Sequence, residues 1–199
     1  MFENISADLD VYAYRKGWPR WAWVFVPLFY TTSWPVITYR FNRWVFMAVR
    51  IPVLRQCLLV AGFILKRVVE TLTTVEISAR ADIGKGLFIA HLGSIVINHQ
   101  TRIGQYAAVH QDVTFGDAGR GEMYGGPTVG ERCYVGAGAK IIGKICIGND
   151  VMIGCNAVVA KDVPDGVSVG GIPAKVLNNL GSQGWIHYRN QPNGTPVQE

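Results

Sequence analysis

Aliphatic side chains recur at every sixth position from Val75 onward, through the C-terminal two thirds of the chain. The fourteen positions that follow this spacing, with one two-residue shift and one longer interruption, are Ile77, Ile83, Ile89, Ile95, Ile97, Ile103, Val109, Phe115, Val129, Val135, Ile141, Ile147, Ile153 and Val159. Neither the 3.6-residue period of a helix nor the alternation of an isolated strand explains this series. A period of six is typical of hexapeptide repeats, in which each repeat supplies one short strand and three repeats close one coil. The pattern therefore predicts a mainly β protein with a β-helix over residues 71–178.

Glycine and proline mark the turns and the end of this repeat. Glycines follow many of the aliphatic positions, as expected where the chain turns a corner, at Gly84, Gly104, Gly116, Gly130, Gly136, Gly148 and Gly154. Pro164 and Pro173 are expected to stop further regular coils, since proline cannot donate to a strand ladder. Residues 179–199, which end in "NQPNGTPVQE", are predicted to form a loosely held tail.

Residues 1–70 follow a different pattern and are predicted to form helices interrupted by prolines. The segment "WAWVFVPLFYTTSWPVITY", from Trp21 to Tyr39, has 19 residues and no charge. Its length meets the threshold for a transmembrane helix, but its two prolines and its hydroxyl side chains disfavour a span. Two interpretations remain open: a helical segment lying at a membrane surface, or a cap or oligomer contact packed against the β-helix.

Charge is distributed unevenly along the chain, whose formal net charge is +5. Between Val11 and Val69 there are nine Lys or Arg residues and no Asp or Glu. We expect a partner of opposite charge to bind the N-terminal third, and an anionic lipid surface fits its basic and aromatic composition. No nucleic acid is expected as a partner.

The four cysteines form no CxxC pair, and no signal peptide is visible. A reduced, cytoplasmic protein is therefore predicted, located at the inner face of the membrane if the N-terminal third binds lipid.

His91 is the first candidate for chemistry, because it interrupts an apolar run two residues after the repeat position Ile89. Glu76 lies 15 residues earlier, about one coil back, so the two side chains could be neighbours on adjacent coils. A carboxylate on one imidazole nitrogen fixes the tautomer and leaves the other nitrogen free to accept a proton. His91 could equally be a hydrogen-bonded corner histidine. His99 and His110 fall in other phases of the repeat, so no metal site is predicted.

The loop from Gly116 to Thr128 is a second candidate, because it interrupts the repeat. Its sequence "GDAGRGEMYGGPT" lacks the Gly-Lys-Ser/Thr ending of a P-loop. A loop that leaves a rigid coil is suited to covering a site.

Four segments together resemble the serine acetyltransferase branch of the hexapeptide acyltransferases, over roughly residues 45–178. They are "VEISARADIGKGLFIAHLGSIVIN", "VHQDVTFGDAGRG", "VGAGAKIIGKICIGNDVMIGCNAVV" and "DVPDGVSVGGIPAKV". The resemblance implies a left-handed parallel β-helix, a homotrimer with active sites between subunits, and acetyl-CoA as the acyl donor.

Carried over residue by residue, the family's catalytic histidine falls on His91 and its partnering carboxylate falls on Glu76. The acceptor hydroxyl would give its proton to His91 as it attacks the thioester. The positions implied to contact the cofactor are Gly116, Asp117, Ala137, Gly138 and Cys155, with Lys161 and Lys175 near the nucleotide phosphates.

The groups that hold serine in this family are changed in this chain. Ala90 stands where an aspartate precedes the catalytic histidine, Gly125 and Gly126 replace an arginine and a second histidine, and His99 replaces a glutamate. This combination resembles the O-acetyltransferases of exopolysaccharide and capsule synthesis, so a sugar hydroxyl is the expected acceptor. The alternatives are a serine O-acetyltransferase of cysteine biosynthesis and a non-catalytic, membrane-binding trimer.

Overall fold

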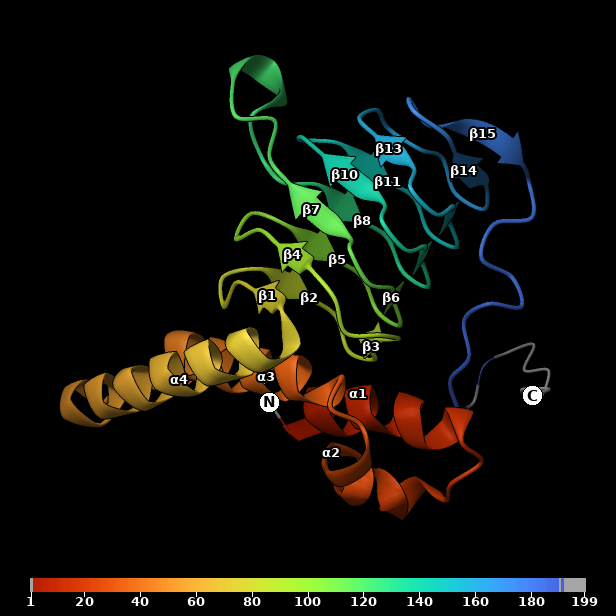
Figure 1. Cartoon of the computed structure of the whole chain (residues 1–199). Helices are drawn as coiled ribbons and strands as arrows, with labels where there is room; N and C mark the ends of the chain where they lie inside the picture. Colours follow the sequence, from red (N-terminus) through yellow and green to blue (C-terminus); the bar gives the residue numbers. More distant parts are fainter. Residues whose placement is uncertain (1, 190, 192–199) are drawn as a thin grey trace.

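The computed structural model describes residues 2–189 and residue 191. Five helices come first, and a coiled array of short strands follows (Figure 1). The helices are α1 (Phe2–Arg15), the 3₁₀ helix η1 (Arg20–Phe25), α2 (Val26–Phe29), α3 (Ser33–Ala48) and α4 (Pro52–Thr73). One further 3₁₀ helix, η2 (Gly121–Met123), lies in a loop that projects from the array.

The strands form three parallel sheets that share one axis, so the fold is a parallel β-solenoid. Sheet A contains β1 (Val75–Ile77), β4 (Ile95–Ile97), β7 (Thr114–Gly116), β10 (Lys140–Ile142) and β13 (Val158–Val159). Sheet B contains β2 (Asp82–Ile83), β5 (Arg102–Ile103), β8 (Thr128–Val129) and β11 (Cys146–Ile147). Sheet C contains β3 (Phe88–Ile89), β6 (Ala108–Val109), β9 (Tyr134–Val135), β12 (Met152–Ile153), β14 (Ser168–Gly170) and β15 (Lys175–Asn178). The solenoid and its N-terminal helices confirm the predicted fold class and are consistent with a left-handed β-helix.

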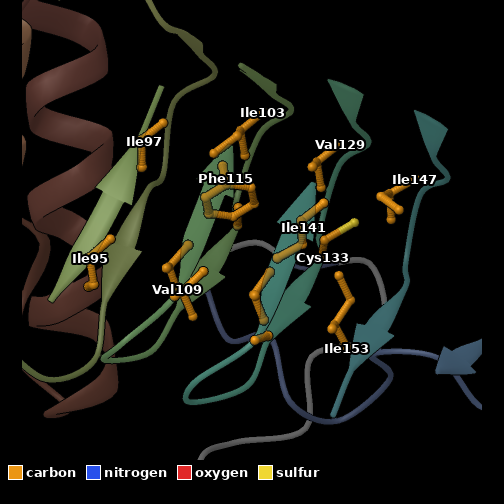
Figure 2. Packing of buried hydrophobic residues seen from close by; sticks show 14 of the residues in the cluster. Ile95, Ile97, Ile103, Val109, Phe115, Val129, Cys133, Ile141, Ile147 and Ile153 are labelled. Atoms are coloured by element: carbon orange, nitrogen blue, oxygen red, sulfur yellow. The ribbon is translucent and has the colours of Figure 1, made fainter. Parts of the chain in front are cut away.

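The core of the solenoid consists of the side chains that recur every six residues. All fourteen predicted positions are buried, with at most 4% of their surface exposed. Figure 2 shows several of them, among them Ile97, Phe115 and Ile141, pointing into the space between the sheets. Each coil therefore buries aliphatic side chains against the coils before and after it, which is the main source of stability in repeat proteins.

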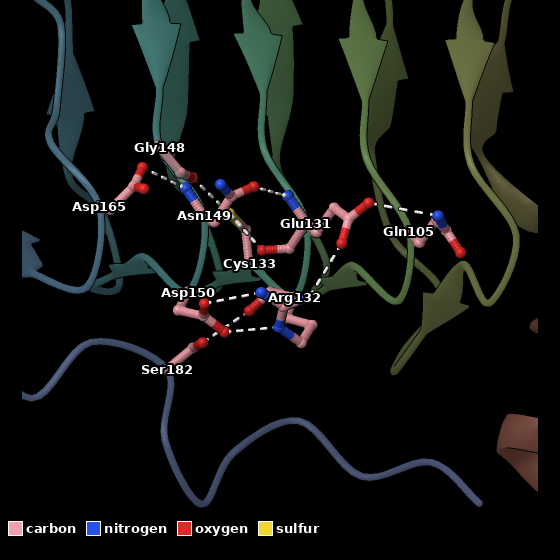
Figure 3. A network of polar contacts seen from close by, with 9 residues as sticks. All are labelled: Gln105, Glu131, Arg132, Cys133, Gly148, Asn149, Asp150, Asp165 and Ser182. Carbon is pink, nitrogen blue, oxygen red and sulfur yellow. Dashed lines mark hydrogen bonds and ion pairs between the residues drawn. The ribbon is translucent and has the colours of Figure 1, made fainter. Parts of the chain in front are cut away.

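The corners between sheets B and C require close approach of the backbone. A Cβ atom on Gly104 would lie 2.6 Å from the backbone of Gly130, which explains why glycine recurs here. Beside these glycines, Arg132 forms ion pairs with Asp150 (2.7 Å) and Glu131 (2.9 Å), and its carbonyl oxygen accepts a hydrogen bond from Ser182 (Figure 3). Polar contacts thus link successive coils along this corner.

The prediction that Pro164 stops the regular coils is wrong. After this proline, β14 still pairs in parallel with β12, because Pro164 lies in the corner before the strand and leaves the ladder intact. The solenoid ends one strand later, where β15 folds back antiparallel to β14. Pro173 lies in the turn between these two strands, as a residue without an N–H donor can.

Helices α1 and α3 supply the hydrogen bonds that the first coil cannot obtain from a preceding coil. Asp8 of α1 accepts hydrogen bonds from the backbone N–H groups of Gly86 (2.7 Å) and Leu87 (2.9 Å). Arg40 of α3 donates to the carbonyl oxygen of Ile83 (2.6 Å) and forms an ion pair with Asp8 (2.7 Å). Both charged side chains are buried, so the pair and its backbone partners satisfy one another inside the protein.

Two tyrosines extend this arrangement across the same coil. The Tyr12 hydroxyl accepts a hydrogen bond from the N–H of Ile89 and donates to the carbonyl oxygen of the same residue. The Tyr39 hydroxyl accepts from the N–H of Ile83 and donates to the carbonyl oxygen of Ala81. The N-terminal helices therefore cover the open end of the solenoid (Figure 1).

The uncharged segment from Trp21 to Tyr39 does not form one continuous helix. It is divided among η1, α2 and the first part of α3, and the buried residues of α3 pack toward the solenoid. Among the helices that the structure describes, none has the length and apolar character needed to cross a bilayer.

The described part of the C-terminal tail is held against the protein. The ring of Tyr188 stacks on Tyr106, with centroids 3.8 Å apart, and Arg189 forms an ion pair with Asp10 of α1 (3.1 Å). Residues 181–189 thus run alongside the solenoid from its last coil to α1 (Figure 1), which differs from the predicted loose tail. These two contacts, one aromatic and one ionic, were not predicted because the composition of the tail is polar. Of the C-terminal stretch "NQPNGTPVQE", only Gln191 lies within the described residues.

We expect Arg40→Ala to lower the free energy of unfolding by about 3–5 kcal/mol, because it leaves the Asp8 carboxylate buried without its partner. Chemical denaturation followed by circular dichroism measures this change. Lys85→Ala is the matched control, since the ion pair of Lys85 with Glu3 is largely exposed and should contribute about 0–1 kcal/mol. Equal losses in the two variants would show that the buried pair does not hold the helices to the solenoid.

Candidate active site

His91 lies on the corner between sheets C and A, in the turn that leaves β3. Ile89, two residues earlier, is fully buried, whereas the His91 side chain is exposed. Strands β3, β6, β9 and β12 pair in register, so the residues two positions after each buried anchor form one column along the axis. The members of this column, called the C–A column, are His91, Gln111, Ala137 and Cys155. Two predicted cofactor positions, Ala137 and Cys155, therefore lie in the same column as His91. Gly138 follows Ala137 in the same turn.

His110 lies beside His91, one coil further along. The two ring centroids are 5.9 Å apart, and a continuous aromatic row extends from His110 to Tyr134 (4.8 Å) and from there to Trp185 (5.3 Å). Burial lowers the pKa of the His110 imidazole below its ordinary value, and the neighbouring His91 and Arg15 lower it further. His110 is therefore a neutral hydrogen-bonding group near pH 7. No role for His110 was evident in the sequence, because its aromatic neighbours His91 and Tyr134 come from the coils before and after its own.

Gln111, between His91 and Ala137 in the C–A column, also escaped the sequence analysis. Its side-chain oxygen is buried and has no hydrogen-bond partner within the described residues. A buried amide oxygen without a partner is costly, so a rotation of this side chain toward a molecule bound next to His91 would satisfy it.

Glu76 lies on sheet A, in strand β1, one coil before the strand that follows His91. It pairs in register with Val96, and its side chain is exposed. Across residues 2–189, no hydrogen bond or ion pair joins Glu76 to His91. The predicted pair thus lies on adjacent coils around one corner, without a hydrogen bond or ion pair between the two side chains in the described part of the chain.

The remaining predicted cofactor positions lie elsewhere on the solenoid. Gly116, Asp117 and Lys161 are on the corner between sheets A and B, where Gly116 pairs with Ile142. Lys175 is exposed on β15, at the end of sheet C. Within one chain, the predicted site is therefore divided between two corners.

A basic cleft of about 680 Å³ lies on this second corner, below the loop that carries η2. Basic side chains from several coils gather in it: Arg43, Arg80, His99, Arg102 and Lys144. Gly125 and Gly126 line it as well. The cleft is therefore suited to a small anionic group such as a carboxylate.

Metal chemistry finds no support among the described residues, where no three His, Cys, Asp or Glu side chains gather around a common point. The four cysteines are all free thiols, and Cys133 is buried in the core.

A parallel solenoid built on hexapeptide repeats, with an exposed imidazole at a corner, defines the class of hexapeptide-repeat acyltransferases. No family model matches the chain. The serine acetyltransferase of Synechococcus elongatus is 34% identical over 181 residues, which is 91% of this chain and 70% of that protein. The serine acetyltransferase of Helicobacter pylori is 43% identical over 113 residues, 57% of this chain and 66% of that protein. The chain belongs to the serine acetyltransferase family, and it spans about two thirds of the length of these relatives.

Solved structures agree with this assignment. The serine acetyltransferase of Neisseria gonorrhoeae in complex with serine superposes with a TM-score of 0.72 and 25% identity, over 87% of this chain and 68% of that one. A serine acetyltransferase in complex with CoA superposes with a TM-score of 0.69 and 28% identity, over 88% of this chain and 70% of that one.

The prediction of a sugar acceptor in exopolysaccharide or capsule synthesis is wrong, because relatives up to 43% identical are named serine acetyltransferases. The prediction was based on the absence of polar side chains at Ala90, Gly125 and Gly126. It did not include the polar side chains that adjacent coils place beside two of these positions. His110 follows the strand position paired with Ile89 and so stands beside Ala90, and Lys144 lies 3.2 Å from where a Cβ of Gly125 would be. A side chain at Gly126 would collide with the backbone one coil away. Polar groups thus lie near two of the changed positions.

We expect His110 to titrate below the ordinary histidine value of about 6.5, because burial disfavours its charged form. Replacing His91 by glutamine should raise the pKa of His110, since one neighbouring group that can carry positive charge is removed. Nuclear magnetic resonance of the imidazole protons against pH measures both values. His99→Gln is the control, because His99 lies on another corner and should leave the titration unchanged. A titration of His110 at or above the ordinary value would contradict the placement.

Proposed function

We propose that this chain is an acetyl-CoA-dependent serine O-acetyltransferase. The observation that carries the proposal is the position of His91: an exposed imidazole on a coil whose anchor, Ile89, is fully buried. A general base must be held in place and must also reach its substrate, and this corner meets both requirements. The names of the relatives and the serine and CoA complexes of the structural neighbours support the choice of substrates.

In the proposed reaction, His91 accepts the proton of the serine hydroxyl as the oxygen attacks the thioester carbonyl. The new carbon–oxygen bond forms, the carbon–sulfur bond breaks, and the proton on His91 passes to the departing CoA sulfur. Glu76 is proposed to hold the second nitrogen of His91 when substrates are bound, which fixes the tautomer. Both side chains are exposed and can turn toward each other around the corner.

Acetyl-CoA is proposed to lie along the C–A column, with its thioester at His91. The side chains beyond Gln111 in that column are small, those of Ala137 and Cys155, so an extended pantetheine arm can approach the backbone. The Gln111 side chain is proposed to rotate when the arm binds, so that its oxygen, which has no partner within the described residues, accepts a hydrogen bond from an amide N–H. Gly138 follows Ala137 in the same turn, and the exposed Lys161 and Lys175 are proposed to meet the phosphates.

A homotrimer is proposed because the two halves of the site lie on different corners of one chain. If the C–A column of one chain faces the second corner of the next, His91 meets Gly116, Asp117 and the basic cleft. Closed cyclic assembly repeats this contact three times. Lys144 and Arg102, in the cleft, are proposed to hold the carboxylate of serine.

We expect His91→Ala to lower the rate of acetyl transfer to L-serine by about 10²–10⁴-fold, because the general base is lost. Release of CoA thiol in the presence of L-serine measures the rate. His99→Ala is the matched control, because its imidazole is also exposed but has no proposed role in proton transfer. Wild-type protein that releases CoA no faster with L-serine than without it would overturn the proposed acceptor. An unchanged rate in His91→Ala would overturn the proposed base.

The shared site can be tested by mixing two variants. His91→Ala and Lys144→Ala should each be strongly impaired, since one lacks the base and the other a carboxylate partner. After the two are unfolded and refolded together, about a quarter of the wild-type rate should return, because one interface in four combines the two intact corners. Recovery no greater than that of each variant refolded alone would mean that each site belongs to a single chain.

A further inference from the structure

Besides the apolar side chains exposed along α4, a second group of large apolar side chains on the N-terminal helices is exposed. It lies on η1 and α2, and we name it the apolar tip: Trp21, Val24, Phe25, Leu28 and Phe29, with exposed fractions of 65, 50, 44, 78 and 68%. After Arg20, no charged residue occurs until α3. Exposed apolar groups of this size mark interaction sites.

The tip is firmly held in this position. Val26 is fully buried against α1, and Ala22 is also buried, so the inner side of the segment is fixed. The indole N–H of Trp34 donates to the carbonyl oxygen of Pro27 (2.8 Å), which ties α2 to α3. The main contacts of η1 and α2 are with α1, with each other and with α3, and Figure 1 places α2 on the side of the helices away from the sheets.

Two basic residues next to the tip form no ion pair within the described residues, although Arg20 lines a pocket that also contains Glu3 and Asp10. Of the nine basic residues between Val11 and Val69, four are engaged in ion pairs: Arg40, Arg43, Lys66 and Arg67. Lys16 and Arg20, which directly precede the tip, are exposed and form no salt bridge with any residue that the structure describes. No acidic residue occurs in this stretch.

We infer that the apolar tip docks the protein onto an anionic lipid surface. Tryptophan and phenylalanine prefer the boundary between headgroups and acyl chains, and adjacent cations attract anionic headgroups. A second copy of this chain is a poorer occupant, because it would bring the same positive charges against each other. Three tips in one assembly would strengthen a contact that is weak for a single chain.

The inference is tested by flotation of the full chain with vesicles of phosphatidylcholine, with or without phosphatidylglycerol. Wild-type protein should float with the anionic vesicles, and high salt should weaken this binding. Trp21→Ser combined with Phe29→Ser should lower the partition coefficient at least about tenfold. Lys16→Gln combined with Arg20→Gln should lower it about thirtyfold, from about 1 kcal/mol for each cation.

The matched control is Val60→Ser combined with Ile64→Ser. These two residues are exposed on α4 to a similar degree but lie outside the tip, so vesicle binding should remain. Both tip variants should keep the wild-type acetyl transfer rate without vesicles, which shows that they fold. Failure of the wild type to float would overturn the inference, as would loss of binding only in the α4 variant. A lower molecular mass of the tip variants in lipid-free solution would also overturn it, because a second copy would then be the occupant.

Discussion

The buried ion pair between Asp8 and Arg40 is the contact on which the rest of the structure depends. A solenoid satisfies its backbone by stacking each coil on the one before it, and the first coil has none before it. Helices α1 and α3 replace that missing coil with a carboxylate, a guanidinium and two tyrosine hydroxyls, all directed at backbone groups of the first coil. A buried charge pair is stabilising only when its remaining hydrogen bonds are satisfied. Here the first coil supplies them, so the helices and the solenoid complete each other.

The stacking that builds the core also arranges the chemistry. Because successive coils pair in register, a residue's place in the repeat determines which column it joins on the surface. His91 and Gln111 share a column with the small side chains of Ala137 and Cys155, along which the extended substrate is proposed to lie. The cations fall on another corner. The two halves of the proposed site therefore lie on different sides of one chain, so the proposed reaction requires two chains to associate.

The solenoid could be predicted from the sequence because its pattern is local. Each aliphatic side chain at the six-residue spacing indicates a buried position, and all fourteen such positions are buried. The same regularity located His91. What the sequence could not show were contacts between residues far apart in the chain. His110 has neighbours from α1 and from two other coils, and Lys144 lies beside Gly125 across a coil. The prediction of a sugar acceptor was wrong for this reason, because it considered single positions without their neighbours on adjacent coils. The ion pair of Arg189 with Asp10 spans almost the whole chain, beyond any periodic signal.

That last contact changes how the stack can come apart. Solenoids have only nearest-neighbour contacts, so their terminal repeats normally open first and independently of the rest. Here the segment after the last coil returns along the outside and is fastened to α1 by Arg189, with Tyr188 stacked on Tyr106 on the way. Unfolding of the final coil therefore removes contacts from α1, the helix that covers the first coil. The two ends of the array are linked in this way, and we expect the last coil and α1 to unfold together rather than separately.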